Sequence, residues 1–142
     1  SRYWKEEEGP LVIWWGGQEN NVRLMLILAD ILQKTEEKKD RDLLLKSIVP
    51  HQSNLEEVQN LLHHTLFELR ISAKTEVIIK PEEASISETI IAGSKGAALV
   101  FMGLAIPELS RLRSFYSNLR EYTNESASVI FVRNNSSDLT YE

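Results

Sequence analysis

Five short apolar runs, rich in β-branched and aromatic residues, recur along the chain. They are Leu11–Trp15, Leu43–Val49, Glu76–Lys80, Ala97–Gly103 and Ser128–Arg133. Apolar residues at helical spacing lie between them, and strands that alternate with helices are typical of a parallel sheet. The first and fourth runs are apolar throughout, which favours two neighbouring central strands buried on both faces. With right-handed crossovers, the pattern predicts a three-layer α/β domain whose five-stranded parallel sheet has the order 3-2-1-4-5.

Helices are expected between these strands. They cover about 20–34, 53–69 and 85–93, and a fourth starts near Pro107. Asn20 or Asn21 is a plausible N-cap for the first helix. Ser53 and Glu56 have the Ser-x-x-Glu spacing of a capping box, in which each side chain binds the other residue's free backbone N–H. The second helix is therefore expected to open at Ser53.

The first helix is apolar on two faces. Its main apolar face consists of Val22, Met25, Leu26, Ala29 and Leu32, and its second consists of Leu24, Ile27, Leu28 and Ile31. A surface helix usually has one apolar stripe, and a flanking helix has only one sheet to cover. We therefore predict that the second face packs against another domain or another copy of this chain. The alternative is that neighbouring parts of the same chain cover it.

Length and composition exclude several classes of function. A chain of 142 residues has the length of a single domain; we divide it into a lead-in (1–10), an α/β domain (11–133) and a polar tail (134–142). The net charge of −5 and the scattered Lys and Arg residues argue against a nucleic-acid partner. The absence of cysteine excludes disulfides, thiolate metal sites and a cysteine nucleophile.

Parallel sheets bind ligands at the carboxyl ends of their strands, here between the first and fourth strands. The loop after the first strand leads into a helix N-terminus, where free N–H groups favour an anion. Residues that line this candidate crevice are Trp15, Gly16, Gly17, Gln18, Asn20 and Gly103. Two adjacent glycines match neither GxGxxG nor the P-loop pattern. The alternative is a tight turn in which glycine supplies a positive φ.

No residue set points to catalysis or metal binding. His63 and His64 are adjacent on a helix, so their side chains point about 100° apart and cannot share a ligand on one face. Ser94 lacks the Gly-x-Ser-x-Gly pattern of a nucleophile elbow. Trp14 and Trp15 alternate to opposite faces of a strand, where both are expected in the core. We therefore expect a protein that is not an enzyme and has no metal or cofactor.

Five ordered segments carry a resemblance to a known family. They are 12–17 (VIWWGG), 24–29 (LMLILA), 69–73 with 76–78 (LRISA, EVI), 99–104 (LVFMGL) and 129–134 (VIFVRN). Together they resemble the carboxyl-terminal cytoplasmic domain of cation–chloride cotransporters in its short prokaryotic form. The resemblance extends from about Leu11 to Arg133.

This resemblance implies a soluble domain at the cytoplasmic face of the cell membrane, attached to a secondary transporter of the amino acid–polyamine–cation superfamily. In that family the cytoplasmic domain has two halves similar to universal stress proteins, and this chain resembles the second half. The implied partners are the first half and the membrane domain of the same chain, together with a second copy in a homodimer. The transport site would lie in the membrane part, so no ion-binding residue is carried over.

Stress-protein relatives often bind ATP through an acidic residue on the first strand and a glycine-rich segment after the fourth. This chain instead has Trp14-Trp15-Gly16 and Leu104-Ala105-Ile106-Pro107 at those positions. The leading hypothesis is therefore a noncatalytic regulatory and oligomerisation domain of a transporter. The alternative is a ligand-sensing domain that binds a nucleotide or a small anion between the first and fourth strands.

Overall fold

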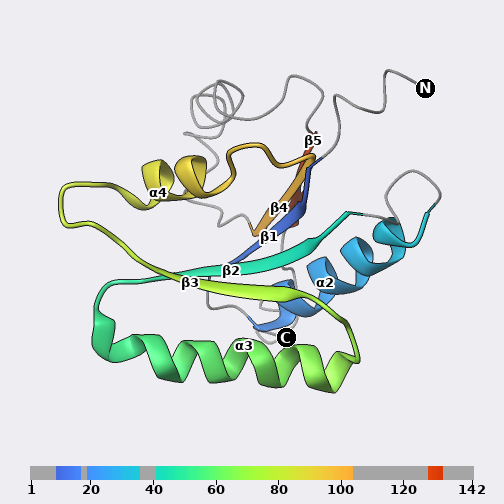
Figure 1. The fold of residues 1–142 in the computed structure, drawn as a ribbon, viewed down its shortest axis with the longest axis horizontal. Coiled ribbons are helices and arrows are strands. Elements are labelled where there is room, and N and C mark those ends of the chain that lie inside the picture. The colour runs from blue at the N-terminus through green and yellow to red at the C-terminus, as the bar shows by residue number, and fades with distance from the viewer. Residues whose placement is uncertain (1–8, 17–18, 36–40, 104–127, 133–142) are drawn as a thin grey trace, which may run out of the picture.

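A computed structural model describes residues 9–16, 19–35, 41–103 and 128–132 (Figure 1). The strands are β1 (Leu11–Trp15), β2 (Leu43–Val49), β3 (Lys74–Ile79), β4 (Leu99–Gly103) and β5 (Ser128–Val132). The helices are α2 (Glu19–Gln33), the 3-10 turn η1 (Gln52–Asn54), α3 (Leu55–Leu69) and α4 (Ile86–Gly93). All neighbouring strands are parallel and their order is β3-β2-β1-β4-β5. The predicted α/β class and strand order are confirmed.

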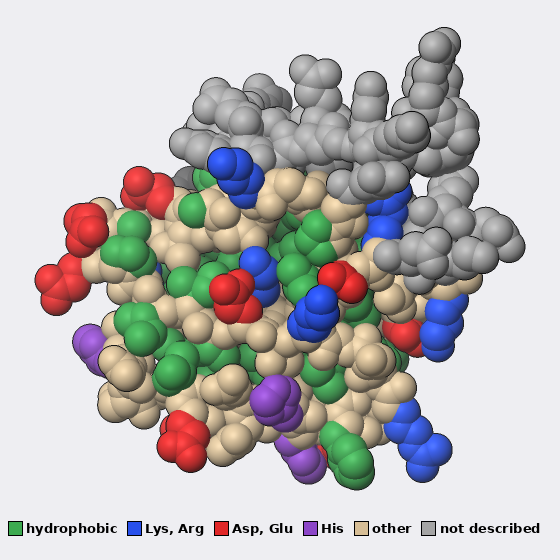
Figure 2. All heavy atoms as spheres, viewed as in Figure 1, with side chains coloured by type: hydrophobic (Ala, Val, Ile, Leu, Met, Phe, Trp, Pro, Cys, Tyr) green, Lys and Arg blue, Asp and Glu red, His purple; other side chains and the backbone are tan. Residues whose placement is uncertain are grey.

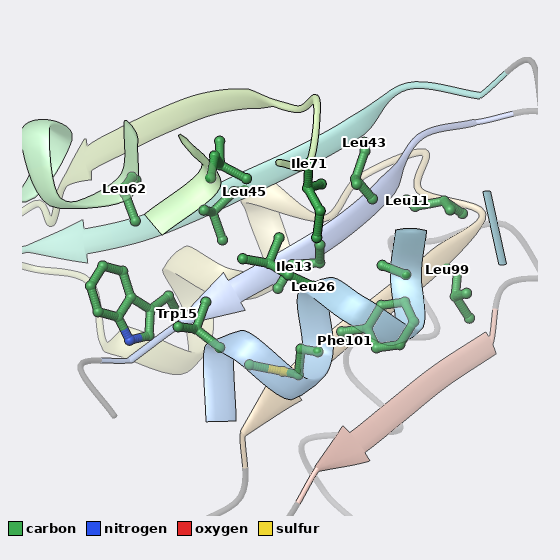
Figure 3. Close-up of a cluster of buried hydrophobic side chains, with 14 residues drawn as sticks. Leu11, Ile13, Trp15, Leu26, Leu43, Leu45, Leu62, Ile71, Leu99 and Phe101 are labelled. Atoms are coloured by element: carbon green, nitrogen blue, oxygen red, sulfur yellow. The ribbon is translucent and has the colours of Figure 1, made fainter. Parts of the chain in front are cut away.

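One face of the sheet is covered by α2 and α3, which lie on the opposite side from α4 (Figure 1). Alternate residues of β1, β2 and β4 point to this face, because successive side chains of a strand alternate. They form a buried cluster with the inward residues of α2 and α3 (Figure 3). β1 is buried along its whole length, as expected for a strand between two layers.

A smaller cluster lies on the face that α4 covers. It contains Val12, Trp14, Ala97, Val100 and Met102, and Ile90 of α4 packs against it. Consecutive residues Trp14 and Trp15 therefore belong to opposite core layers, as the alternation of a strand predicts. Both indoles are buried.

The bounds of several elements differ from the predicted ones. β3 begins at Lys74 and ends at Ile79, and β4 begins at Leu99 rather than Ala97. α2 begins at Glu19, so the prediction of an N-cap at Asn20 or Asn21 is wrong, because both residues lie within the helix. The predicted helix from Pro107 and the tail 134–142 lie outside the described residues.

The prediction of a capping box at Ser53 and Glu56 is also wrong. Ser53 lies in η1, α3 starts at Leu55, and its N-cap Asn54 makes no side-chain capping hydrogen bond. The capping box instead starts α4, whose predicted range agrees with the structure. There the Glu88 N–H donates to Ser85 Oγ at 3.0 Å, and the Ser85 N–H donates to Glu88 Oε1 at 2.9 Å. Hydrogen bonding of the Glu88 carboxylate, first with the Ser85 backbone N–H and then with the Ser85 side chain, lowers the pKa of Glu88.

Candidate functional site

The carboxyl ends of β1 and β4 lie side by side at the centre of the sheet. Trp14 pairs with Met102, so the next residues, Trp15 and Gly103, end their strands at the same level. The topology therefore brings together the two chain positions from which a crevice was predicted. Gly17 and Gln18 lie outside the described residues, as does the side chain of Asn20, although its backbone belongs to α2. Ligand binding by these residues stays a prediction.

Trp15 has a buried polar group that finds no partner among the described residues. Its side chain lies at the end of the larger core cluster, where β1 finishes (Figure 3). Among the described residues no acceptor lies within hydrogen-bonding distance of its Nε1, and Trp15 is only 5% exposed. Its backbone carbonyl accepts a hydrogen bond from Ser47 Oγ at 3.0 Å. An unpaired buried donor is uncommon, because it forfeits its hydrogen bond to water.

Trp14 has the opposite environment. Its Nε1 donates to the Oγ of the fully buried Ser94 at 2.8 Å. Lys46 Nζ lies 5.8 Å from the centroid of the Trp14 ring and donates to the Gly93 carbonyl at 2.8 Å. The Lys46 side chain, 12% exposed, also pairs with Glu76 at 3.0 Å. These groups tie the end of α4 to the sheet, and the sequence pattern did not indicate them.

The alternative of a tight turn after β1 can be examined at Gly16, because Gly17 lies outside the described residues. Gly16 does not have a positive φ; of the described glycines, Gly96 does, with φ of 78°. A Cβ added at Gly16 would meet no atom within 4 Å. The described structure therefore gives no steric reason for glycine at this position. Glu19 is the first residue of α2.

The described part of the chain holds no group of three or more His, Asp or Glu residues placed to bind a metal ion. None of the helices within it has an apolar stretch long enough to cross a bilayer. His63 Nε2 lies 2.9 Å from Thr75 Oγ1, and His64 Nε2 lies 3.3 Å from Glu68. These two histidines therefore have separate partners, as their positions on a helix predict.

The second apolar face of α2 is open to solvent. Leu24 is 46% exposed, Ile27 44%, Leu28 37% and Ile31 58%. The opposite face, with Val22, Met25, Leu26 and Ala29, is buried against the sheet. The two-sided pattern thus corresponds to one face in the core and one at the surface. Arg23 of α2 pairs with Glu68 of α3 at 3.0 Å, which links the two helices beside this surface. What covers the surface stays a prediction.

The comparisons with known proteins show the fold. No protein-family model matches the chain, and no curated protein matches it. Among solved structures, the universal stress protein from Archaeoglobus fulgidus in complex with dAMP is similar, with a TM-score of 0.58. The match covers 87% of this chain and 96% of that protein at 12% sequence identity. The chain therefore has a universal-stress-protein-like fold, as the resemblance implied, while at this identity the likeness extends to the fold alone.

Proposed function

We propose that this chain is a noncatalytic regulatory and oligomerisation domain of a secondary transporter similar to cation–chloride cotransporters, at the cytoplasmic face of the membrane. The resemblance of its five sequence segments supports the transporter, and the stress-protein-like fold agrees with the domain that the resemblance implies. The observation that carries the proposal is the exposed apolar face of α2. A surface that presents four large aliphatic side chains on one helix is suited to a protein partner.

The exposed fractions set the strength of this contact. Together they equal a little under two fully exposed side chains. Burial of a Leu or Ile side chain stabilises by about 1.5–3 kcal/mol, so covering the four would contribute about 3–6 kcal/mol per copy. Association costs about 4–15 kcal/mol in lost freedom of motion. Two copies joined by α2 alone would therefore associate weakly, and tethering to a membrane domain would strengthen them by raising their effective concentration.

Sedimentation velocity tests the self-association. Ile31→Glu places a carboxylate on the α2 face, and Ile86→Glu is the matched control, because Ile86 is 60% exposed on the opposite side of the sheet. We expect the wild type to associate as concentration rises, Ile31→Glu to associate about ten-fold or more weakly, and Ile86→Glu to resemble the wild type. A wild type that stays monomeric throughout, with both variants identical to it, would refute self-association through α2.

The transporter assignment has a separate test in the reading frame upstream of Ser1. A series of apolar segments, each about 20 residues long, would support it. A reading frame without such segments would refute the assignment while leaving the α2 measurement untouched.

Nucleotide sensing is the second candidate function. The unpaired Nε1 of Trp15, at the strand end where a ligand was predicted, favours it, and the similar stress protein was solved in complex with dAMP. A ligand acceptor that reaches this N–H would recover its lost hydrogen bond. Thermal unfolding with dAMP, AMP and ATP tests the hypothesis, since a ligand at 100 times its Kd stabilises by about 2.7 kcal/mol. Unchanged unfolding with all three nucleotides would refute it.

A further inference from the structure

β3 is an edge strand whose outer side no other described strand covers. It lies at one end of the sheet, and within the described residues β2 is its one partner strand. Within the described part of the chain no helix or strand lies beyond it (Figure 1). Figure 2, in the same view, shows hydrophobic side chains interspersed with acidic and basic ones across this side of the molecule. An exposed edge of this kind can pair with another strand.

The hydrogen-bond pattern identifies the backbone groups that point outward. In a parallel pair, alternate residues direct both their N–H and their C=O to the neighbouring strand. The Lys80 N–H donates to the Val49 carbonyl at 2.9 Å, so the backbone N–H and C=O groups of the even-numbered residues of β3 point toward β2. The odd-numbered residues Thr75, Val77 and Ile79 therefore direct their backbone groups away from the sheet. Ile79 is also 40% exposed.

The sequence of this edge is complementary to itself when reversed. In antiparallel pairing about Ile78, residues whose numbers add up to 156 lie opposite each other. Glu76 then faces Lys80 of a second copy, Ile78 faces Ile78, and Val77 faces Ile79. Shifting the centre to Val77 places Lys74 opposite Lys80, and shifting it to Glu76 places two glutamates opposite each other. Of these registers, the one centred on Ile78 gives two opposite-charge pairs around an apolar centre.

Backbone geometry agrees with the same register. Val77 and Ile79 both direct their N–H and C=O groups outward, so they form hydrogen-bonded pairs with Ile79 and Val77 of the second copy. Thr75 would meet Pro81, which has no N–H, and the ladder would end there. Ile78 then forms a central pair without hydrogen bonds. The backbone hydrogen bonds are thus compatible with this register, and the charges select it over the other two.

Glu76 and Lys80 each have a hydrogen-bonding site left for an ion pair with the second copy. Glu76 is 56% exposed, and one of its oxygens pairs with Lys46, which leaves the second for another cation. Lys80 Nζ donates to the carbonyls of Pro81 and Ala84 at 3.0 and 2.8 Å. No carboxylate among the described residues forms an ion pair with it, and an ammonium group has a third proton to donate.

We propose that two copies of this chain pair antiparallel through β3, centred on Ile78, and so form one continuous sheet. The two α3 helices would lie on the same face, because a twofold axis perpendicular to a sheet preserves its faces. α3 contacts both β3 and β2. If each α3 lies over the gap between these strands, the two helices are about two strand spacings apart, about 9–10 Å, which is a normal helix-packing distance.

Cysteine cross-linking tests the register in this cysteine-free chain. Opposite residues in a pair without hydrogen bonds have Cα atoms about 4.5 Å apart, within the disulfide range. On mild oxidation, Ile78→Cys should therefore form disulfide-linked dimers much faster than Phe67→Cys. Phe67 is a suitable collision control because it is 81% exposed on α3. Equal rates for the two variants would refute the pairing.

Charge reversal gives a second test that requires no oxidation. Lys80→Glu and Glu76→Lys each place like charges opposite each other and should weaken association about ten-fold or more. The double variant restores opposite charges and should regain wild-type association. A mixture of the two single variants should also associate, because each then meets its complement. Failure of both the double variant and the mixture to recover association would refute the proposal.

These measurements are made in the Ile31→Glu background, which weakens any association through α2. Loss of β3 pairing and loss of α2 association are then separate outcomes. The inference concerns a second surface and does not depend on the proposed transporter role.

Discussion

Trp14 and Trp15 provide a matched pair of substitutions within a single strand. Both indoles are about 95% buried, on opposite faces of β1. Trp14 Nε1 has an acceptor in Ser94 Oγ, whereas Trp15 Nε1 has none among the described residues. Each Trp→Phe change removes a similar apolar area, so this loss is common to both. The difference between the two variants therefore reports the hydrogen bond.

The expected magnitude follows from the partner left behind. Trp14→Phe leaves the buried Ser94 hydroxyl without its donor, which costs about 1–3 kcal/mol. Trp15→Phe removes an N–H that has no acceptor among the described residues, so it leaves no described acceptor unpaired. We expect Trp14→Phe to be less stable than Trp15→Phe by about 1–3 kcal/mol. With a urea slope of about 1–3 kcal/mol per M, their midpoints should differ by about 1 M.

Urea unfolding followed by far-UV circular dichroism measures this difference without relying on tryptophan fluorescence. Ser94→Ala is the control, because it leaves the Trp14 N–H without its acceptor and should destabilise the domain although the ring is unchanged. Equal midpoints for the two tryptophan variants, or a lower midpoint for Trp15→Phe, would refute the reasoning.

Four further predictions concern helix ends. Gly93→Ala should destabilise the fold by about 1–3 kcal/mol in thermal unfolding, because its Cβ would lie 2.6 Å from Cη2 of the buried Trp14 ring. Arg70→Gly should stabilise it by up to about 1 kcal/mol, because Arg70 caps α3 with a left-handed φ of 57°. Ser85→Ala should cost about 1 kcal/mol through the lost cap of α4. Because the pKa of Glu88 is lowered, its carboxylate stabilises the folded α4 above the pKa of glutamate in the unfolded chain, and this stabilisation is lost as pH falls through the folded pKa. Amide exchange of α4 should therefore become faster on acidification. Glu88→Gln should abolish this pH dependence.

The central strands were the most predictable part of the fold. Predicted ranges 11–15 and 43–49 agree with β1 and β2, because burial on one or both faces gives a strong apolar or alternating pattern. β3 was less well defined, since an edge strand retains polar residues such as Lys74 and Thr75. The capping box was assigned to the wrong helix because Ser53-x-x-Glu56 and Ser85-x-x-Glu88 share one spacing. The chain folds into a 3-10 turn at the first, which no four-residue motif encodes.

The candidate site was predictable in position but not in chemistry. Strand order places Trp15 and Gly103 together, and that follows from hydrophobic patterning and crossover handedness. Whether an indole N–H has an acceptor depends on side chains distant in sequence. Trp14 finds one 80 residues away in Ser94, whereas Trp15 has none among the described residues. The exposed second face of α2 was easier to predict from the sequence, because four large aliphatic residues at helical spacing exceed what one sheet can cover.

Lys46 joins three elements of the molecule, two strands and a helix, through one ammonium group. It caps the carboxyl end of α4 at Gly93, lies over the Trp14 ring of β1, and pairs with Glu76 on β3. The first contact satisfies a carbonyl that the helix itself leaves unbonded. A cation that replaces Lys46 as the partner of Glu76 would thus affect α4 without contacting that helix. The edge strand β3 and the helix α4 are therefore connected through Lys46, and amide exchange of α4 can report on changes at the edge of the sheet.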